Sequence, residues 1–401
     1  MANSYLNRTS IATPSSRRTF TMSAWVKKCD ISNSQGVIWI GADTNNWVQF
    51  KFESGTDLRM ECRNSGSNVI DLTTNRKFRD VNAFYHILAQ VDTTQATESN
   101  RVKLWVNGVQ ETSFATATYP SQNLDLDTTT EQKVGLQHGT QYFNGYIAHA
   151  AYVDGSVVAP TTFGETDSTS GIWKFKSPSG VTWGTNGFHL KFENSGAMGT
   201  DSSGNSNTFT VNGNLKQSLD TPTNVHVTYN SNQNLNDNNI LSDGNTTQKE
   251  TSTVGQRQAI CNMGAFTGKW YAEFKMINLG PQNGSSPYCG ALSMSNYDND
   301  TYLGNNGIAM HPGGNIYRSA SVIDSQTSIT YTTNSIVSVA LDITNNKCHF
   351  RVNGGTWLGS GDPVNNTGGY DISSLNTGDG MTFASSVFNN NCQWSVNFGN
   401  G

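Results

Sequence analysis

Short alternating segments constrain this chain most strongly, because they recur along its length while helical periodicity is scarce. Few windows combine Ala, Leu, Glu and Lys at helical spacing, whereas apolar and polar residues alternate with period two in many places. Runs of Gly, Asn and Ser, such as residues 32–36 and 64–66, separate these segments and are typical of turns. Many short strands at this spacing predict an all-β protein built as a sandwich or barrel.

The alternation predicts strands in three parts of the chain. In the first part they are 20–27, 36–40, 47–52, 58–62, 69–72, 85–92, 102–106, 133–136 and 145–153. In a middle part they are 187–192 and 207–211, after one helical turn beginning at Pro160. In the last part they are 258–263, 268–276, 288–294, 307–310, 315–317, 336–342, 347–352, 381–386 and 393–398.

Two details of the pattern predict local geometry. Residues 102–108 and 347–354 both end in Val-Asn-Gly, and Asn-Gly supplies the positive φ angles of a tight hairpin turn. In the segment 20–27, alternation places Met22, Ala24 and Val26 on one face of the strand. Trp25 then lies on the opposite face, where it needs either a second covering layer or a ligand.

Composition excludes several classes of protein. The chain has 401 residues, only 14% of them charged, with a formal net charge of −5 and 41 aromatic residues (9 Trp, 14 Tyr and 18 Phe) for its cores. Because no dense Lys/Arg cluster occurs, we expect no nucleic-acid surface. Because no apolar run approaches about 18 residues and the N-terminus lacks the apolar core of a signal peptide, we expect no membrane insertion and synthesis in the cytosol. Six dispersed cysteines without a CxxC pair favour buried free thiols over zinc ligands or disulfides.

Several motifs carry a resemblance to known families. The first part resembles laminin-G-like, concanavalin A-like lectin domains in its segments 20–27 (FTMSAWVK), 84–92 (FYHILAQVD), 101–109 (RVKLWVNGV) and 142–154 (YFNGYIAHAAYVD). The last part is similar to the SPRY family, whose opening strand matches 268–274 (GKWYAEF) and whose later hairpin matches 334–345 with 348–354. The resemblance implies two concanavalin A-like jelly-roll sandwiches, at 1–158 and 236–401, joined by a β-rich connecting segment at 159–235.

The connecting segment carries a further resemblance, which implies a more specific function. Its pieces 163–167, 171–173, 184–190 and 199–205 look like the region that follows such modules in virion proteins of tailed bacteriophages. The resemblance implies a non-enzymatic virion surface protein, made in the cytoplasm of the host bacterium. We expect a tail or tail-fibre adhesin that binds host-surface glycan, with capsid decoration or tail assembly as the alternative role. Its expected partners are other virion proteins, host carbohydrate and further copies of itself.

An enzyme that degrades polysaccharide is the remaining alternative. Concanavalin A-like glucanases need carboxylates in the pattern Glu-x-Asp-x-x-Glu, so that acid, nucleophile and helper surround one glycosidic bond. The nearest match is Glu165-Thr-Asp167, but Ser170 stands where the second Glu is required. The seven histidines are scattered, and we interpret His149 and His189 as structural. We therefore expect no catalytic residues.

Aromatic residues beside polar turns are the candidates for a ligand site, because sugar rings stack on aromatic faces while Asn and Asp bind hydroxyls. They are Trp47 with Asn46, Tyr288, Tyr297 and Tyr302 around Asp298 and Asp300, and Trp357. Trp25, Trp105, Trp270 and Trp394 are interpreted as core residues, and for Trp47 and Trp357 a core position stays an alternative. Calcium is the expected metal, at Asp201 and Asn205 and at Asp298 and Asp300, although the same residue types also make ordinary turns.

Overall fold

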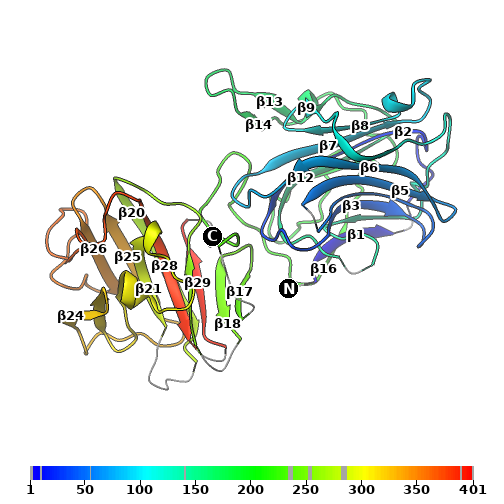
Figure 1. Cartoon of the computed structure of the whole chain (residues 1–401). Helices are drawn as coiled ribbons and strands as arrows, with labels where there is room; N and C mark the ends of the chain where they lie inside the picture. The colour runs from blue at the N-terminus through cyan, green and yellow to red at the C-terminus, as the bar shows by residue number, and fades with distance from the viewer. Residues whose placement is uncertain are drawn as a thin grey trace. The chain divides into compact units, whose positions relative to one another are not determined.

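The regular secondary structure of the chain consists almost entirely of β-strands (Figure 1). A computed structural model describes residues 3–9, 11–54, 56–139, 141–233, 238–251, 255–280, 287–388 and 391–399. The helical elements within these residues are one short α-helix, α1 (Leu303–Asn306), and three 3-10 turns at Glu98–Asn100, Pro160–Thr162 and Met294–Asn296. The chain divides into two compact units, unit 1 (Met1–Val225) and unit 2 (His226–Gly401). The all-β prediction is therefore confirmed.

Unit 1 is a sandwich of two antiparallel sheets. The eight-stranded sheet has the order β10 (Phe114–Thr118), β6 (Ser67–Lys77), β5 (Asp57–Asn64), β4 (Trp47–Phe52), β3 (Gln35–Gly41), β11 (Glu131–Val134), β1 (Tyr5–Thr9) and β16 (Thr210–Asn212). The six-stranded sheet has the order β15 (Phe188–Leu190), β12 (Gly145–Asp154), β2 (Thr19–Lys28), β7 (Tyr85–Asp92), β8 (Val102–Val106) and β9 (Val109–Gln110). Their facing sides enclose one apolar core, to which β2 contributes Met22, Ala24 and Val26 as predicted.

Residues 159–225, the larger part of the predicted connecting segment 159–235, belong to unit 1. They supply the edge strands β15 and β16, one to each sheet, and the hairpin β13 (Gly164–Thr166) with β14 (Trp173–Phe175). The predicted helical turn at Pro160 is present as a 3-10 turn. Near the end of the segment, Asp220 forms an ion pair of 2.7 Å with Lys27 of β2, and both side chains are fully buried. The predicted boundary at 235/236 lies outside the described residues.

Unit 2 is a second sandwich. Its seven-stranded sheet has the order β17 (Asn239–Ser242), β18 (Thr247–Glu250), β29 (Gln393–Asn397), β20 (Lys269–Asn278), β25 (Ile336–Asp342), β26 (Lys347–Val352) and β27 (Tyr370–Asp371). Its six-stranded sheet has the order β19 (Gln256–Ile260), β28 (Met381–Phe388), β21 (Tyr288–Ser293), β22 (Ile308–Met310), β23 (Asn315–Arg318) and β24 (Ser321–Ser325). Phe274, Phe350 and Trp394 belong to the core between the sheets.

Both predicted Val-Asn-Gly turns are confirmed. Asn107 and Gly108 have φ angles of 48° and 77°, and Asn353 and Gly354 have 51° and 70°. All six cysteines are buried and none is in a disulfide, as expected. Within the described parts of the chain, no helix is long and apolar enough to cross a membrane.

Candidate functional site

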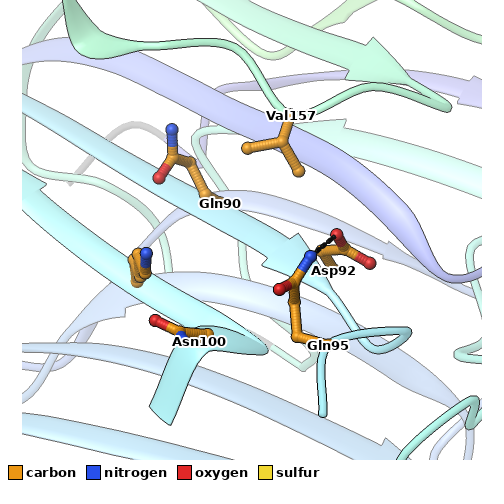
Figure 2. Close-up of a pocket in the computed structure, with 6 residues that line it drawn as sticks. Gln90, Asp92, Gln95, Asn100 and Val157 are labelled. Atoms are coloured by element: carbon orange, nitrogen blue, oxygen red, sulfur yellow. Dashed lines mark hydrogen bonds between the residues drawn. The ribbon is translucent and has the colours of Figure 1, made fainter. Parts of the chain in front are cut away.

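A polar pocket opens on the outward face of the six-stranded sheet of unit 1 (Figure 2). It has a volume of about 240 Å³ and is lined by Gln90, Asp92, Gln95, Asn100, Lys103 and Val157. Gln90 and Lys103 are direct cross-strand neighbours on β7 and β8. Alternation along β7 turns Ile87, Ala89 and Val91 into the core, so Gln90 and Asp92 face outward.

Hydrogen bonds fix the floor of this pocket. The Gln90 amide donates to the carbonyl of Val158 at 2.8 Å and accepts from the indole of Trp105 at 2.8 Å. Asp92 accepts from the backbone and hydroxyl of Thr94, at 3.0 and 2.6 Å, and from the amide of Gln95 at 2.6 Å. Burial alone would raise the pKa of Asp92, but these hydrogen bonds outweigh it and lower that pKa. Asp92 is therefore a preorganised anionic acceptor.

Lys103 completes the chemistry of the pocket. It is half-buried, and among the described residues no carboxylate lies within 4 Å of its ammonium group. Asn100 is exposed at the opening. The pocket thus combines a cation, an anion and amides, which suits a small ligand rich in hydroxyl groups. Its volume lies below the roughly 300–1,000 Å³ of drug-sized sites, so it suits a single ring.

Beside this pocket the outward face of the six-stranded sheet is closed by a third layer. Trp25 is only 2% exposed; its ring stacks on His86 at 5.0 Å and its indole donates to the carbonyl of Phe163 at 3.3 Å. The ring of Trp173 of β14 lies nearly parallel to that of His86, with ring centroids 6.0 Å apart. Of the two alternatives for Trp25, the structure therefore shows a covering layer.

A Ser–His pair lies in this layer, but its proton arrangement opposes catalysis. The His86 Nε2 and Ser23 Oγ atoms are 2.9 Å apart, and the indole of Trp173 donates to Nδ1 at 3.1 Å. Burial lowers the pKa of His86 to about 3, so the ring is neutral. Because Nδ1 accepts from Trp173, the proton resides on Nε2 and His86 donates to Ser23. The imidazole has no free basic nitrogen to activate the hydroxyl.

The carboxylates of the glucanase alternative, Glu165 and Asp167, lie in the β13–β14 hairpin. Both form ion pairs with Lys174, at 3.6 and 3.1 Å. Backbone hydrogen bonding from Ser170, followed by the Lys174 and Ser170 side chains, lowers the pKa of Asp167. Glycoside hydrolysis needs one carboxyl group with a raised pKa as the acid, and Asp167, whose pKa is lowered, does not fit that role.

In unit 1 the structure separates Trp47 and Asn46 from the polar pocket. Trp47 lies on the outward face of the eight-stranded sheet, only 6% exposed, and stacks on His138 at 6.4 Å. Its indole donates to the carbonyl of Thr44 at 3.2 Å. Asn46 is half-buried; it donates to Asp43 and accepts from the backbone of Ser65, so it holds a turn.

In unit 2 the structure brings three predicted tyrosines together. Tyr288 and Tyr302 stack at 4.9 Å, and Tyr297 packs against the same apolar cluster. Tyr288 is 6% exposed, so the tyrosines mainly cover one another. Asp298 and Asp300 are exposed beside them. Trp357 lies elsewhere, half-buried on the outward face of the seven-stranded sheet, where the Arg351 guanidinium covers its ring.

The two predicted calcium loops are stabilised by internal contacts. Asp201 accepts four hydrogen bonds, from His189, Ser203 (backbone and hydroxyl) and Asn207, while the Asn205 amide donates to two carbonyls. Asp298 accepts from the backbone of Asp300, whose side chain pairs with Arg257 at 3.2 Å. Among the described residues, no group of three His, Cys, Asp or Glu side chains is placed to hold a metal. Calcium binding at these loops stays a prediction.

Sequence reasoning missed the pocket and misjudged one tryptophan. The interpretation of Trp270 as a core residue is wrong, because it is 43% exposed at the end of β20. Trp25 and Trp394 are buried as expected, and Trp105 is half-buried in the outer layer. The one usable signal for the pocket was a polar pair, Gln90 and Lys103, on the outward positions of two consecutive strands.

The comparisons with known proteins concern the fold. Residues 2–161 match the profile of a family described as the concanavalin A-like lectin/glucanases superfamily, which confirms the predicted resemblance of the first part. No curated protein matches the chain. Similar solved structures include the SPRY domain of human HERC1 (10% identity, TM-score 0.30, covering 39% of this chain and 91% of that one). A second is a SAP-like pentraxin from Limulus polyphemus (13% identity, TM-score 0.30, covering 39% of this chain and 71% of that one). A third, from Bacteroides ovatus, is described provisionally as a carbohydrate binding protein (13% identity, TM-score 0.36, covering 55% of this chain and 59% of that one).

Proposed function

We propose that this protein is a non-enzymatic carbohydrate-binding protein and that the polar pocket of unit 1 is its sugar site. The observation that carries the proposal is the lining: Gln90 and Asp92 are fixed by hydrogen bonds, while Lys103 and Asn100 are left for a ligand. All six lining residues fall within the region that matches the lectin-like family. The neutral, donating His86 and the paired Glu165 and Asp167 favour binding without catalysis.

Lys103→Ala and Asn100→Ala test the pocket, because neither side chain makes a hydrogen bond to any of the described residues. A glycan array would first identify a bound sugar, and calorimetry would then compare the variants. Each variant should weaken binding about five- to tenfold, as expected for the loss of one or two hydrogen bonds to a ligand. Lys216→Ala, at an exposed lysine of unit 1, is the matched control. Unchanged affinity in both pocket variants would exclude this pocket as the site, and an array without any bound glycan would refute carbohydrate binding.

The place of action is proposed from the sequence resemblance alone. We place the protein on the virion of a tailed bacteriophage, as a tail or tail-fibre adhesin that recognises host-surface glycan. Electron microscopy of the particle with a labelled protein tests this placement. Label on the tail agrees with adhesion, label on capsid faces favours the decoration role, and a particle without label removes both. Release of reducing sugar from host polysaccharide by the purified protein would instead establish an enzyme.

A further inference from the structure

A cluster of polar and aromatic side chains occupies the outward face of the seven-stranded sheet of unit 2. Along β20, Ala272, Phe274 and Met276 point into the core, so Tyr271 and Glu273 face outward. Glu273, Ser338 of β25 and Arg351 of β26 are successive partners in the strand register, so they form one row across the sheet. Trp357 follows β26 and packs against this row.

Arg351 is held in place but has few partners. Its guanidinium carbon lies 4.6 Å from the centre of the Trp357 ring. Its Nε atom is buried and makes no hydrogen bond, and no carboxylate of the described residues lies within 4 Å of the guanidinium. One terminal nitrogen lies 3.4 Å from the hydroxyl of Tyr271, at the long limit for a hydrogen bond. Stacking on Trp357 therefore orients the Arg351 guanidinium, and most of its N–H donors make no hydrogen bond to the described residues.

Tyr271 links this fork to an acceptor. Its hydroxyl donates to Glu273 Oε1 at 2.7 Å, and its side chain is 45% exposed. Glu273 and Arg351 are thus a carboxylate and a guanidinium held apart by a phenol, with no direct ion pair between them among the described contacts. The cluster offers donors, acceptors and an exposed aromatic ring, and its two charges cancel.

We infer that this cluster is a second carbohydrate site, which binds a neutral sugar ring through adjacent hydroxyl groups. Each hydroxyl of a sugar both donates and accepts, so neighbouring hydroxyls can bridge Arg351 and Glu273 while the ring packs against Tyr271. A net charge of zero in the cluster favours a neutral ring over an acidic one. The site lies in unit 2 and shares no residue with the pocket of unit 1.

NMR spectroscopy of the full-length protein tests the inference. The indole N–H signal of Trp357, assigned by its loss in Trp357→Phe, is followed during titration with methyl glycosides of glucose, galactose, mannose and N-acetylglucosamine, and with glucuronate. At least one neutral glycoside should shift this signal. Arg351→Gln should weaken that binding at least tenfold, and Tyr271→Phe, which keeps the ring, about three- to fivefold. Lys275→Gln, at an exposed position on the same strand and face, should leave the affinity unchanged.

The controls separate this site from the pocket of unit 1. Lys103→Ala and Asn100→Ala should not alter the shift of the Trp357 signal, whether or not the pocket itself binds sugar. The inference is overturned if no neutral glycoside shifts the signal, if Arg351→Gln binds as well as the parent protein, or if glucuronate alone binds. It is also overturned if the pocket variants abolish the shift, because the signal would then report the other site.

Discussion

Both sandwiches contain a Val-Asn-Gly turn with positive φ angles, but the space beside the turn differs between them. In unit 1 a β-carbon added at Gly108 would lie 2.5 Å from the ring of Trp173. The Trp173 ring of the covering layer therefore packs directly on the glycine of this turn. In unit 2 a β-carbon added at Gly354 would meet nothing within 4 Å. The outward face of the six-stranded sheet in unit 1 is consequently largely closed. In unit 2, Tyr271 is exposed on the outward face of the seven-stranded sheet. Similar local sequences thus yield a covered face in one unit and an accessible one in the other.

The largest expected effect comes from the buried ion pair that connects residues 159–225 to the rest of unit 1. Asp220→Ala leaves Lys27 buried without its carboxylate and should lower the free energy of unfolding of unit 1 by about 3–5 kcal/mol. The loss in the free energy of unfolding is measured by chemical denaturation, with hydrogen exchange in unit 1 as the probe. Asp125→Ala, which removes an exposed ion pair with Arg18, should change stability by less than about 1 kcal/mol. Equal effects of both substitutions would contradict a fastening role for Asp220.

Substituting the glycine of each Val-Asn-Gly turn, Gly108 in unit 1 and Gly354 in unit 2, tests the difference between the two turns. Gly354→Ala forces a side chain into positive φ and should cost about 1–2 kcal/mol. Gly108→Ala carries the same backbone cost and also displaces Trp173, so it should cost about 3 kcal/mol or more. Thermal unfolding of the two units, resolved by calorimetry, provides the measurement. Identical losses at the two positions would show that Trp173 does not depend on the absence of a side chain at Gly108.

The covering layer should make unit 1 sensitive to acid. Burial lowers the pKa of His86 to about 3, of His149 to about 3 and of His189 to about 4. Because these values lie below the unfolded value near 6.5, the unfolded chain binds more protons, and stability present above pH 6.5 is lost as the pH falls toward 3–4.

For fully buried His86 the loss between pH 7 and pH 5 should be about 2 kcal/mol. Urea midpoints of unit 1 at the two pH values report it. In His86→Gln the dependence on pH should flatten by that amount, whatever the absolute stability of the variant. An unchanged dependence would mean that His86 is already protonated in the folded protein.

Local patterns predicted many of the strands because the information for them is local, although β1, β10, β17 and β18 were not predicted. The strands at 47–52, 85–92, 102–106, 336–342 and 347–352 have the predicted bounds, and both Asn-Gly turns have the predicted φ angles. Trp270 shows where the same reasoning stops. Alternation correctly gives it the core-facing side of β20, shared with Ala272, but period two does not show where along the strand the core ends.

The candidate sites depend on contacts between residues that are distant in sequence. The pocket joins Gln90 and Lys103 to Val157, and the cluster in unit 2 joins Tyr271 to Arg351 and Trp357. Register between strands and the course of the loops place these groups together. Neither the register nor the course of the loops can be predicted from the residue pattern of a single strand.

By itself, the sequence determined many of the strands, their inward and outward faces and the tight turns, because each follows from periodicity or from backbone preferences within a few residues. The division into two sandwich-like parts was implied by the resemblance of longer segments to known families. The sequence also showed that Trp25 needed a partner on its outward face. Only the tertiary structure decided that Phe163 and Phe175 provide it, that residues 159–225 complete unit 1, and that Arg351 stacks on Trp357. These outcomes depend on which distant segments exclude water from a given face, and the free energy of that choice belongs to the whole fold.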